Sequence, residues 1–345
     1  MMPEKQKIKL PFWFKKLYYF EFWPAPVLYF PVLIYLFYLS IKARSFTFFT
    51  LANPGIFLGG IKGESKMDIL KKISPTYLPK SVYLSEPISV YNTLAQLEQA
   101  ELNFPIVIKP DVGERGKQVE KIDNEAALVQ YFQNHAGQFI CQEYIDYPIE
   151  LGVLFYQFPK SNKFGISSIV QKEFLQVTGD NIKTLKQLIL ESDRAQLQLS
   201  YLLKKFEPRL SEVIPYGKVL VLEPIGNHCR GTTFLSGQHL ICSSLEWVFK
   251  EISKDIPGFC IGRFDLKVKS LDDFAVGKNI RIMELNGIAS EPAHIYHPGY
   301  SIVSAYSALF NHAKLIYEIA LENKKQGFAF LTFKSFYSAL KEASS

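Results

Sequence analysis

Four polar residues within two short apolar runs are the strongest sign of chemistry in this chain. Arg263 and Asp265 alternate in GRFDLK, and Glu284 and Asn286 alternate in RIMELNG. Alternate residues of a β-strand point to the same face, so each pair is expected to line one surface. Two carboxylates and an amide oxygen suit Mg²⁺ that also binds phosphate oxygens. The pattern predicts a metal site, with the polar outer faces of half-exposed strands as the alternative.

A glycine-containing loop offers a second site, for an anion. The apolar run FPIVIK (104–109) predicts a buried strand, and it leads directly into PDVGERGK (110–117). The two glycines allow the backbone to fold around a phosphate, while the arginine and lysine supply positive charge. A charged hairpin loop without a ligand is the alternative. The sequence has no GxxxxGK[ST] and no GxGxxG after a strand, so neither a P-loop nor a Rossmann site is indicated.

Three further polar groups could contact a substrate. The run GNHCRGTT (226–233) contains donors for a carboxylate or phosphate, above all Arg230, with a plain turn as the alternative. Lys172 could face an acidic group. The segment SEPAHIYHP (290–298) contains two histidines three residues apart, but prolines bracket them, so it is expected to be a loop near a second substrate, which Ser290 and Glu291 could touch.

Helices and strands that would position these residues follow from hydrophobic periodicity. The expected helices cover residues 67–73, 126–134, 185–191 and 301–324, and the expected strands cover 104–109, 139–144, 152–158, 219–222 and 280–285. On the last helix one apolar face is expected, made of Val303, Tyr306, Phe310, Ala313, Tyr317 and Ala320. With 345 residues, the chain has room for about two domains. Mixed strands and helices predict an α+β fold.

Charge and cysteine content exclude some functions. The chain carries a net charge of +6, but seven basic and two acidic residues up to Arg44 account for +5 of it. The remaining body is nearly neutral, which argues against nucleic acid as a partner. The four cysteines show no CxxC spacing, so no zinc site is indicated and a reducing compartment is expected.

The N-terminal fifty residues have a different composition. Residues 11–50 contain 16 aromatic side chains, and residues 22–41 contain no charge. Twenty such residues are long enough to cross a bilayer, and flanking aromatic and basic residues are typical of a membrane interface. Three prolines and the lysines before the run favour a re-entrant or in-plane anchor over a straight span. A pair of buried core helices is the alternative. Residues 327–340 could be a second surface-lying segment or ordinary core.

Taken in order along residues 66–298, these motifs resemble the ATP-grasp ligases, most closely the D-alanine–D-alanine ligase-like and cyanophycin-synthetase-like branches. Besides the motifs above, the resemblance rests on Ser65-Lys66 before a short helix, on VIKP ending at Pro110, on QEYI (142–145) and on VTGD (177–180) followed by TL and LI. The chain departs from the pattern at Asn181, where glycine is usual, and at Gln142, where glutamate is commoner. The usual N-terminal domain is missing or replaced by the hydrophobic segment.

The resemblance implies an ATP-grasp fold and roles for named residues. Arg263, Lys109 and Arg230 would act in catalysis, and Asp265, Glu284 and Asn286 would bind Mg²⁺ or Mn²⁺. ATP would be held by Lys66, Lys109, the loop residues Asp111, Gly113, Glu114, Arg115, Gly116 and Lys117, the hinge residues Gln142, Glu143, Tyr144 and Ile145, and Glu150 at the ribose.

The expected activity is carboxylate–amine ligation through an acyl phosphate, at the cytoplasmic face of a membrane, on small or lipid-like substrates. The alternatives are a catalytically silent, membrane-tethered nucleotide-binding protein and a phosphotransferase that stops at the phosphorylated substrate. Along the chain we expect a membrane-associating segment (1–50), a reduced N-terminal part with the first ATP lysine (51–105), the ATP-grasp domain (106–325) and an amphipathic C-terminal segment (326–345).

Overall fold

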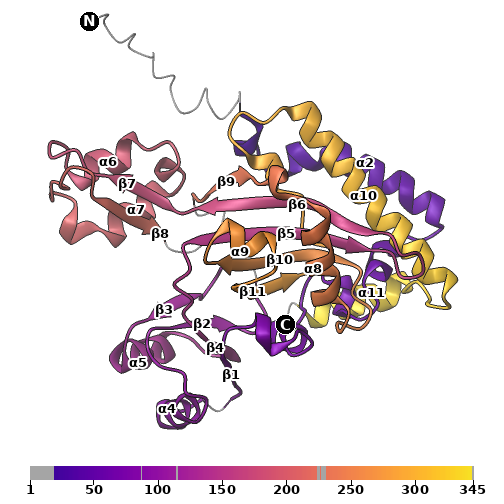
Figure 1. The fold of residues 1–345 in the computed structure, drawn as a ribbon, viewed down its shortest axis with the longest axis horizontal. Helices are drawn as coiled ribbons and strands as arrows, with labels where there is room; N and C mark the ends of the chain where they lie inside the picture. Colours follow the sequence, from indigo (N-terminus) through magenta and orange to yellow (C-terminus); the bar gives the residue numbers. More distant parts are fainter. Residues whose placement is uncertain (1–18, 87, 114–115, 224–225, 227–230, 344–345) are drawn as a thin grey trace, which may run out of the picture.

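The protein combines three antiparallel sheets with helices in a computed structural model, which describes residues 19–86, 88–113, 116–223, 226 and 231–343 (Figure 1). The α-helices are α2 (Ala25–Ala43), α3 (Lys66–Leu70), α4 (Val90–Gln99), α5 (Glu125–Asn134), α6 (Leu185–Glu191), α7 (Leu199–Lys205), α8 (Ser243–Ser253), α9 (Leu271–Ala275), α10 (Ile302–Lys325) and α11 (Phe333–Glu342). Short 3-10 helices connect them, among them η1 (Phe20–Phe22), η2 (Phe48–Ala52), η8 (Gln238–Leu240) and η9 (Ala293–Tyr296). All the helices and strands predicted from periodicity are present, and the α+β content is confirmed.

The first sheet has four strands in the order β1-β4-β2-β3, namely β1 (Ser81–Leu84), β4 (Phe139–Glu143), β2 (Ile106–Pro110) and β3 (Glu120–Ile122). The apolar run predicted as a buried strand is β2, whose Ile106 and Ile108 are fully buried. They pack with side chains of α4 and α5, including Leu97 and Leu128. This sheet therefore holds Lys109 and the glycine loop on a rigid support.

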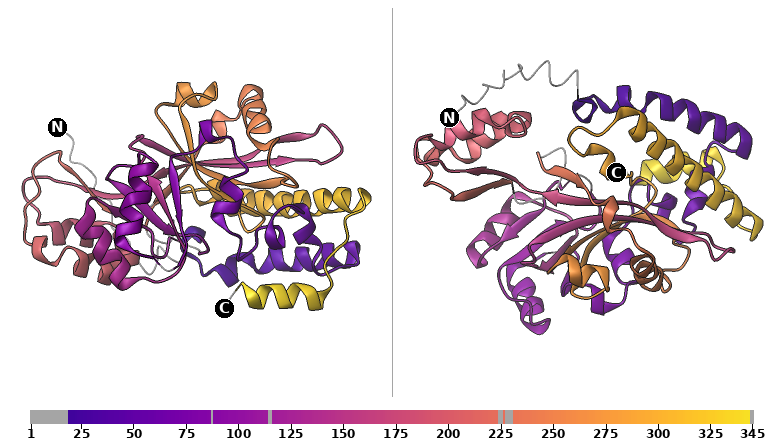
Figure 2. Two further views of the ribbon diagram at one scale, coloured as in Figure 1. Left: turned by 90° about the horizontal axis from the view of Figure 1, so that it is seen from below. Right: turned by 45° about the horizontal axis from the view of Figure 1, so that its top comes forward.

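The second sheet has five strands in the order β11-β10-β5-β6-β9, namely β11 (Ile280–Asn286), β10 (Ile261–Val268), β5 (Ile149–Gln157), β6 (Phe164–Glu173) and β9 (Thr233–Ser236). One face packs on α8 and α9 through Phe155, Phe249 and Phe274. The other face is covered in part by α2 and α10, which run side by side in Figures 1 and 2. Buried helices on both faces fix the register of the strands that carry the polar pairs.

The third sheet is a two-stranded ribbon of β7 (Leu175–Thr178) and β8 (Val219–Glu223). It forms its own small core with α6 and α7, in which Leu185, Ile189 and Leu202 are buried. The VTGD sequence lies at the end of β7, where Gly179 approaches the backbone of Ile214 too closely to accept a side chain. Thr184 begins α6 with a capping box that includes Gln187.

Helix α10 packs differently from the prediction for its apolar face. Phe310, Ala313, Tyr317 and Ala320 do face the protein, but Val303 is 75 % exposed, so its assignment to the buried face was wrong. The buried side instead includes Ala305, Leu309, His312 and Ile316, which lie three or four residues apart.

Helix α2 is the one described helix that is long and apolar enough to cross a membrane by length and composition. One side contacts α10 and η9 and buries Leu28, Val32 and Leu39. The other side is exposed to solvent along the whole helix. At the far end of the chain, α11 has no buried residue and contacts the body chiefly through the Phe336 ring, whose centre lies 5.6 Å from that of Phe49.

Candidate functional site

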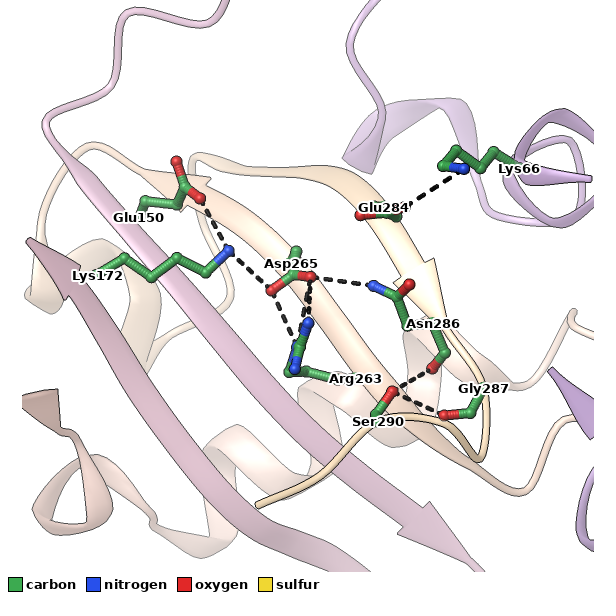
Figure 3. Close-up of polar contacts among 9 residues, drawn as sticks. All are labelled: Lys66, Glu150, Lys172, Arg263, Asp265, Glu284, Asn286, Gly287 and Ser290. Carbon is green, nitrogen blue, oxygen red and sulfur yellow. Dashed lines mark hydrogen bonds and ion pairs between the residues drawn. The ribbon is translucent and has the colours of Figure 1, made fainter. Parts of the chain in front are cut away.

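Asp265 is the centre of a buried charged cluster on the large sheet, which Figure 3 shows in close-up. Its carboxylate accepts hydrogen bonds from Arg263 Nη2 at 3.0 Å and from the Asn286 amide at 3.0 Å, and it lies 3.1 Å from Lys172 Nζ. Burial alone would raise the pKa of Asp265, but Arg263 and Lys172 outweigh it and lower that pKa to about 2. The carboxylate is therefore ionised at any physiological pH.

Strand pairing explains why these residues meet. Arg263 lies opposite Asn286 and Asp265 lies opposite Glu284 in the β10–β11 pair, so both predicted pairs occupy one face. On the other side of β10, Gly152 lies opposite Asp265. A Cβ at Gly152 would come within 3.2 Å of both Arg263 and Asp265, so glycine leaves the room that this ion pair needs.

Lys172 joins Glu150 to the same cluster. Its Nζ lies 2.9 Å from Glu150 Oε1, and both side chains are largely buried. Burial lowers the pKa of Lys172, but Asp265 and Glu150 together outweigh this and leave it raised. Glu150 thus lies within the charged cluster on β5, and the sequence indicated only that Lys172 could face an acid.

Two lysines reach β11 from outside the large sheet, one from helix α3 and one from strand β2 of the four-stranded sheet. Lys66, at the start of α3, places Nζ 3.8 Å from Glu284 Oε1 and donates to the backbone oxygen of Gly113 at 2.6 Å. Lys109 on β2 donates to Gln142 Oε1 at 3.1 Å and to the backbone oxygen of Met283 at 2.7 Å. Burial lowers the pKa of Lys109 to about 8.

Strand β11 is where the two groups meet. Along it, Met283 is contacted by Lys109 of the four-stranded sheet and Glu284 by Lys66 of α3, while Asn286 contacts Asp265 of the neighbouring strand β10. The four cations are Lys66, Lys109, Lys172 and Arg263, and the three carboxylates are Glu150, Asp265 and Glu284. The buried carboxylate of Asp111 also acts on Lys109, so positive and negative groups are equal in number. Four cations gathered in a partly buried cluster beside carboxylates suit a polyanion that brings its own counter-cation.

The glycine loop is the turn between β2 and β3. Asp111 is buried at its base and accepts a hydrogen bond from the backbone N–H of Met67, so it holds α3 in place. Gly113 contacts Lys66, Gly116 has a φ of 69°, and Lys117 is exposed. Glu114 and Arg115, predicted to contact ATP, lie outside the described residues, as do Arg230, His228 and Cys229.

The predicted hinge connects the two sheets. Gln142 is buried between Lys109 and Ser81, and Glu143 ends β4 with its backbone N–H bonded to Lys80. Tyr144 and Ile145 follow in the link to β5: the Tyr144 ring lies beneath Lys121 and Lys267, and the Ile145 oxygen accepts a hydrogen bond from Lys267 at 3.0 Å.

The segment after β11 turns back over the cluster. Ser290 Oγ donates to the backbone oxygens of Gly287 at 2.7 Å and of Asn286 at 3.0 Å. Glu291 follows it, and burial raises its pKa to about 7, against a hydrogen bond from Tyr296. His294 pairs with Ser168, and His297 accepts from the backbone of Ser236, so the two histidines point to different partners.

The predicted metal ligands fit a hard divalent cation by their chemistry. Asp265 and Glu284 are direct cross-strand partners, and because the Asn286 amide nitrogen faces Asp265, its oxygen is left as an acceptor. Glu284 keeps 32 % of its side chain exposed, and its nearest cation lies 3.8 Å away. Within the described part of the chain, no three His, Cys, Asp or Glu side chains gather as a metal cluster, so this site would need its amide ligand and oxygens from a substrate.

Comparisons with known proteins find partial structural likeness. No protein-family model matches the sequence, and no curated protein matches it. Among solved structures the chain is similar to D-alanine–D-alanine ligase from Bacillus anthracis, with 14% identity and a TM-score of 0.43 over 76% of this chain and 69% of that one.

Two further likenesses are of the same kind. The D-Ala:D-Ser ligase VanG from Enterococcus faecalis gives 15% identity and a TM-score of 0.40 over 73% of this chain and 61% of that one. A bifunctional glutathione synthetase from Pasteurella multocida gives 14% identity and 0.37 over 71% of this chain, which spans 35% of that enzyme.

Proposed function

We propose that this protein is an ATP- and Mg²⁺-dependent carboxylate–amine ligase of the ATP-grasp type. The observation that supports this most is the arrangement along β11. There Glu284 faces Lys66 of α3, the Met283 oxygen accepts from Lys109 of the four-stranded sheet, and Asn286 bonds to Asp265 of β10. A partly buried cluster of cations that also offers hard oxygen ligands suits a metal–nucleotide complex.

In this proposal the side chains position the substrates and neutralise their negative charge. Lys66, Lys109 and the glycine loop would bind phosphate oxygens, and Arg263 would stabilise negative charge that develops on the reacting groups. Mg²⁺ or Mn²⁺, held by Asp265, Glu284 and Asn286, would supply charge neutralisation at the phosphates.

Bond changes follow from that arrangement. A substrate carboxylate oxygen would attack the γ-phosphorus of ATP, the bond to the bridging oxygen would break, and ADP would leave. An amine would then attack the acyl carbon, lose a proton and expel inorganic phosphate. Exclusion of water from the site would protect the acyl phosphate.

The test measures ADP release by the purified full-length chain with mixtures of carboxylates and amines. Release should need both substrates and should fall at least ~100-fold in Glu284→Gln and in Asp265→Asn, since each removes a proposed metal ligand. Glu318→Gln, at an exposed carboxylate paired with Lys314, is the matched control and should retain activity.

Other outcomes separate the alternatives. ADP release without an amine would indicate a phosphotransferase, and nucleotide binding without ADP release would indicate a silent binding protein. Wild-type turnover in both the Asp265 and Glu284 variants would refute the metal assignment.

We further propose that the enzyme works at the cytoplasmic face of a membrane, lying on the bilayer through α2. One side of α2 is packed on α10, while Val27, Phe30, Leu33, Ile34, Phe37, Tyr38 and Ile41 on its other side are 54–63 % exposed. Lys42 and Arg44 at its end suit anionic headgroups. A helix with one side packed on the body favours the in-plane orientation, in which the substrates would be amphiphiles or small molecules at the surface.

Vesicle flotation tests this attachment. The full-length chain should float with vesicles that contain phosphatidylglycerol, and the double variant Phe30→Ser/Phe37→Ser should float far less. Tyr216→Ser, which changes an exposed aromatic side chain outside α2, should behave as the wild type. A full-length chain that stays freely soluble beside such vesicles would refute the proposal.

A further inference from the structure

A carboxylate outside the proposed metal site lies beside the charged cluster of the large sheet. Glu291 follows the turn after β11, in which Ser290 Oγ donates to the backbone oxygens of Asn286 at 3.0 Å and of Gly287 at 2.7 Å. These bonds tie Glu291 to the end of the strand that carries two of the proposed metal ligands. The residue is only partly buried. Its backbone is therefore held in place, while its side chain keeps access to a ligand.

The register of the sheet places η9 on the same face as the charged cluster. One residue from each of the strands β6, β5, β10 and β11 forms a row across the sheet, in the order Val170, Gly152, Asp265 and Glu284. Side chains of cross-strand partners point to the same face. Tyr296 of η9 belongs to the apolar cluster that contains Val170, and it is close enough to Arg263 to act on the pKa of that side chain. Tyr296 therefore borders the charged cluster.

Tyr296 also connects this border to Glu291. It offers a side-chain hydrogen bond to the Glu291 carboxyl group, and its hydroxyl oxygen lies 3.2 Å from that of Tyr29 on α2. A Tyr29 hydroxyl that donates to Tyr296 leaves the Tyr296 proton to be donated to the carboxylate. A carboxylate can accept about four hydrogen bonds, so this contact orients Glu291 and leaves it most of its capacity as an acceptor.

Glu291 differs from the other carboxylates of this face in its electrostatic surroundings. Asp265, Glu150 and Glu284 each have a lysine or arginine within ion-pair distance. Among the described residues, only two influences act on Glu291: burial raises its pKa to about 7, and the hydrogen bond from Tyr296 opposes this. A carboxylate that is partly desolvated and lacks a cation is unfavourable. A positively charged ligand group is therefore favoured at this position.

We infer that Glu291 binds the amine substrate as its ammonium ion and accepts the proton whose loss makes that amine nucleophilic. The inference rests on the proposed ligase function, in which an amine attacks an acyl phosphate. It assigns the amine to a chemical class, namely aliphatic amines that are protonated near neutral pH. Tyr296 is a positioning residue in this scheme, because it acts through the Glu291 carboxylate.

The proton transfers balance as follows. One N–H bond of the ammonium ion breaks, its electron pair stays on nitrogen, and the proton moves to a Glu291 oxygen. The neutral amine attacks the acyl carbon, the carbon–oxygen bond to phosphate breaks, and the phosphate takes the second proton from nitrogen. Glu291 then returns its proton to water. A base with a pKa near neutrality is suited to such a transfer.

Competing nucleophiles test this role on the purified full-length chain, with ATP and the carboxylates of the activity assay. Hydroxylamine is uncharged near pH 8, needs no base and converts an acyl phosphate into a hydroxamate. Glu291→Gln keeps the size of the side chain and an acceptor for Tyr296. It should lower amide formation from aliphatic amines at least ~100-fold but change hydroxamate formation less than about threefold. A merely structural role would reduce both products equally.

Two further variants complete this test. Glu291→Asp retains a carboxyl group and should restore part of the amide formation. Glu318→Gln, at an exposed carboxylate on α10, is the matched control and should form both products as the wild type does. Undiminished amide formation in Glu291→Gln, or an equal loss of amide and hydroxamate, would overturn the inference. A wild type that forms neither product would instead refute the proposed ligase function.

A binding measurement decides the role of Glu291 without turnover. In saturation-transfer NMR near pH 8, n-butylammonium should bind the full-length chain saturably and at least about tenfold more tightly than n-butanol, its uncharged counterpart. Glu291→Gln should abolish this preference, and Glu318→Gln should retain it. Equal binding of the two probes by the wild type, or an unchanged preference in Glu291→Gln, would overturn the inference even if the chain proves to be a ligase.

Discussion

The Asp265 cluster on the large sheet and His312 on α10 accommodate buried polar groups in opposite ways. Asp265 is charged and meets Arg263, Lys172 and Asn286 at 3.0–3.1 Å. His312 of α10 is similarly inaccessible to solvent but is neutral near pH 7, because burial lowers its pKa to about 4 against the opposing effect of the Ser290 backbone. Burial is tolerated at the first site because opposite charges are paired, and at the second because no charge is present.

The largest expected effect is a loss of stability when the Asp265 carboxylate is removed. Asp265→Ala leaves Arg263 and Lys172 as buried cations without their shared partner, and should lower the free energy of unfolding by ~3–5 kcal/mol. Urea denaturation of the purified protein measures this.

Glu284→Ala is the matched control for that loss. Glu284 is 32 % exposed and its nearest cation is 3.8 Å away, so the cost should be below ~1 kcal/mol. Equal destabilisation by the two variants would contradict the view that Asp265, besides its proposed role at the metal, stabilises the fold far more than Glu284 does.

The two regions should also differ in the pH range over which they affect the free energy of unfolding. The pKa of His312 is about 4 in the folded protein against an ordinary 6.5, so the unfolded chain binds the extra proton. Its stabilising effect is complete above pH 6.5 and is lost as the pH falls toward 4, by on the order of 3 kcal/mol. The pKa of Asp265 is lowered from 3.8 to about 2, so the stability that its carboxylate provides should be lost only as the pH falls below 3.8.

Denaturation midpoints measured across the range check this separation. His312→Leu should flatten the decline between about pH 6.5 and pH 4 and leave the decline below pH 3.8 unchanged. His294, with a similar shift, keeps part of the upper decline in that variant. An unchanged slope in His312→Leu would show that the imidazole is solvated or already protonated.

A smaller effect is expected from the glycine that makes room for the ion pair. In Gly152→Ala the new methyl group would lie 3.0 Å from Val170 and 3.2 Å from Arg263 and Asp265. Such crowding should cost ~1–3 kcal/mol and displace the ion pair. Unfolding measurements that show no loss, together with unchanged nucleotide binding, would mean that the strand adjusts freely.

Local features of this fold were predictable from sequence. Alternation in GRFDLK and RIMELNG correctly placed the polar side chains of β10 and β11 on one face, because side-chain direction depends only on the strand itself. The long apolar run of β2 likewise identified a buried strand that ends at Lys109.

Features that depend on long-range pairing were not predictable. The contact between Lys172 and Asp265 requires β5 to lie between β6 and β10, which no local pattern encodes. Gly152 carries a sequence signal, since glycine is unfavourable inside a strand, but only the register explains it. The error at Val303 has the same origin, because its exposure depends on which element covers the first turn of α10.

The packing of α2 on α10 has a practical consequence for recombinant work. The apolar helix would ordinarily be trimmed away to obtain a tractable sample. Here Leu28 and Leu39 belong to the same cores as Leu309 and Tyr317, so trimming would uncover those side chains and promote aggregation. The N-terminal helix should therefore be retained for purification.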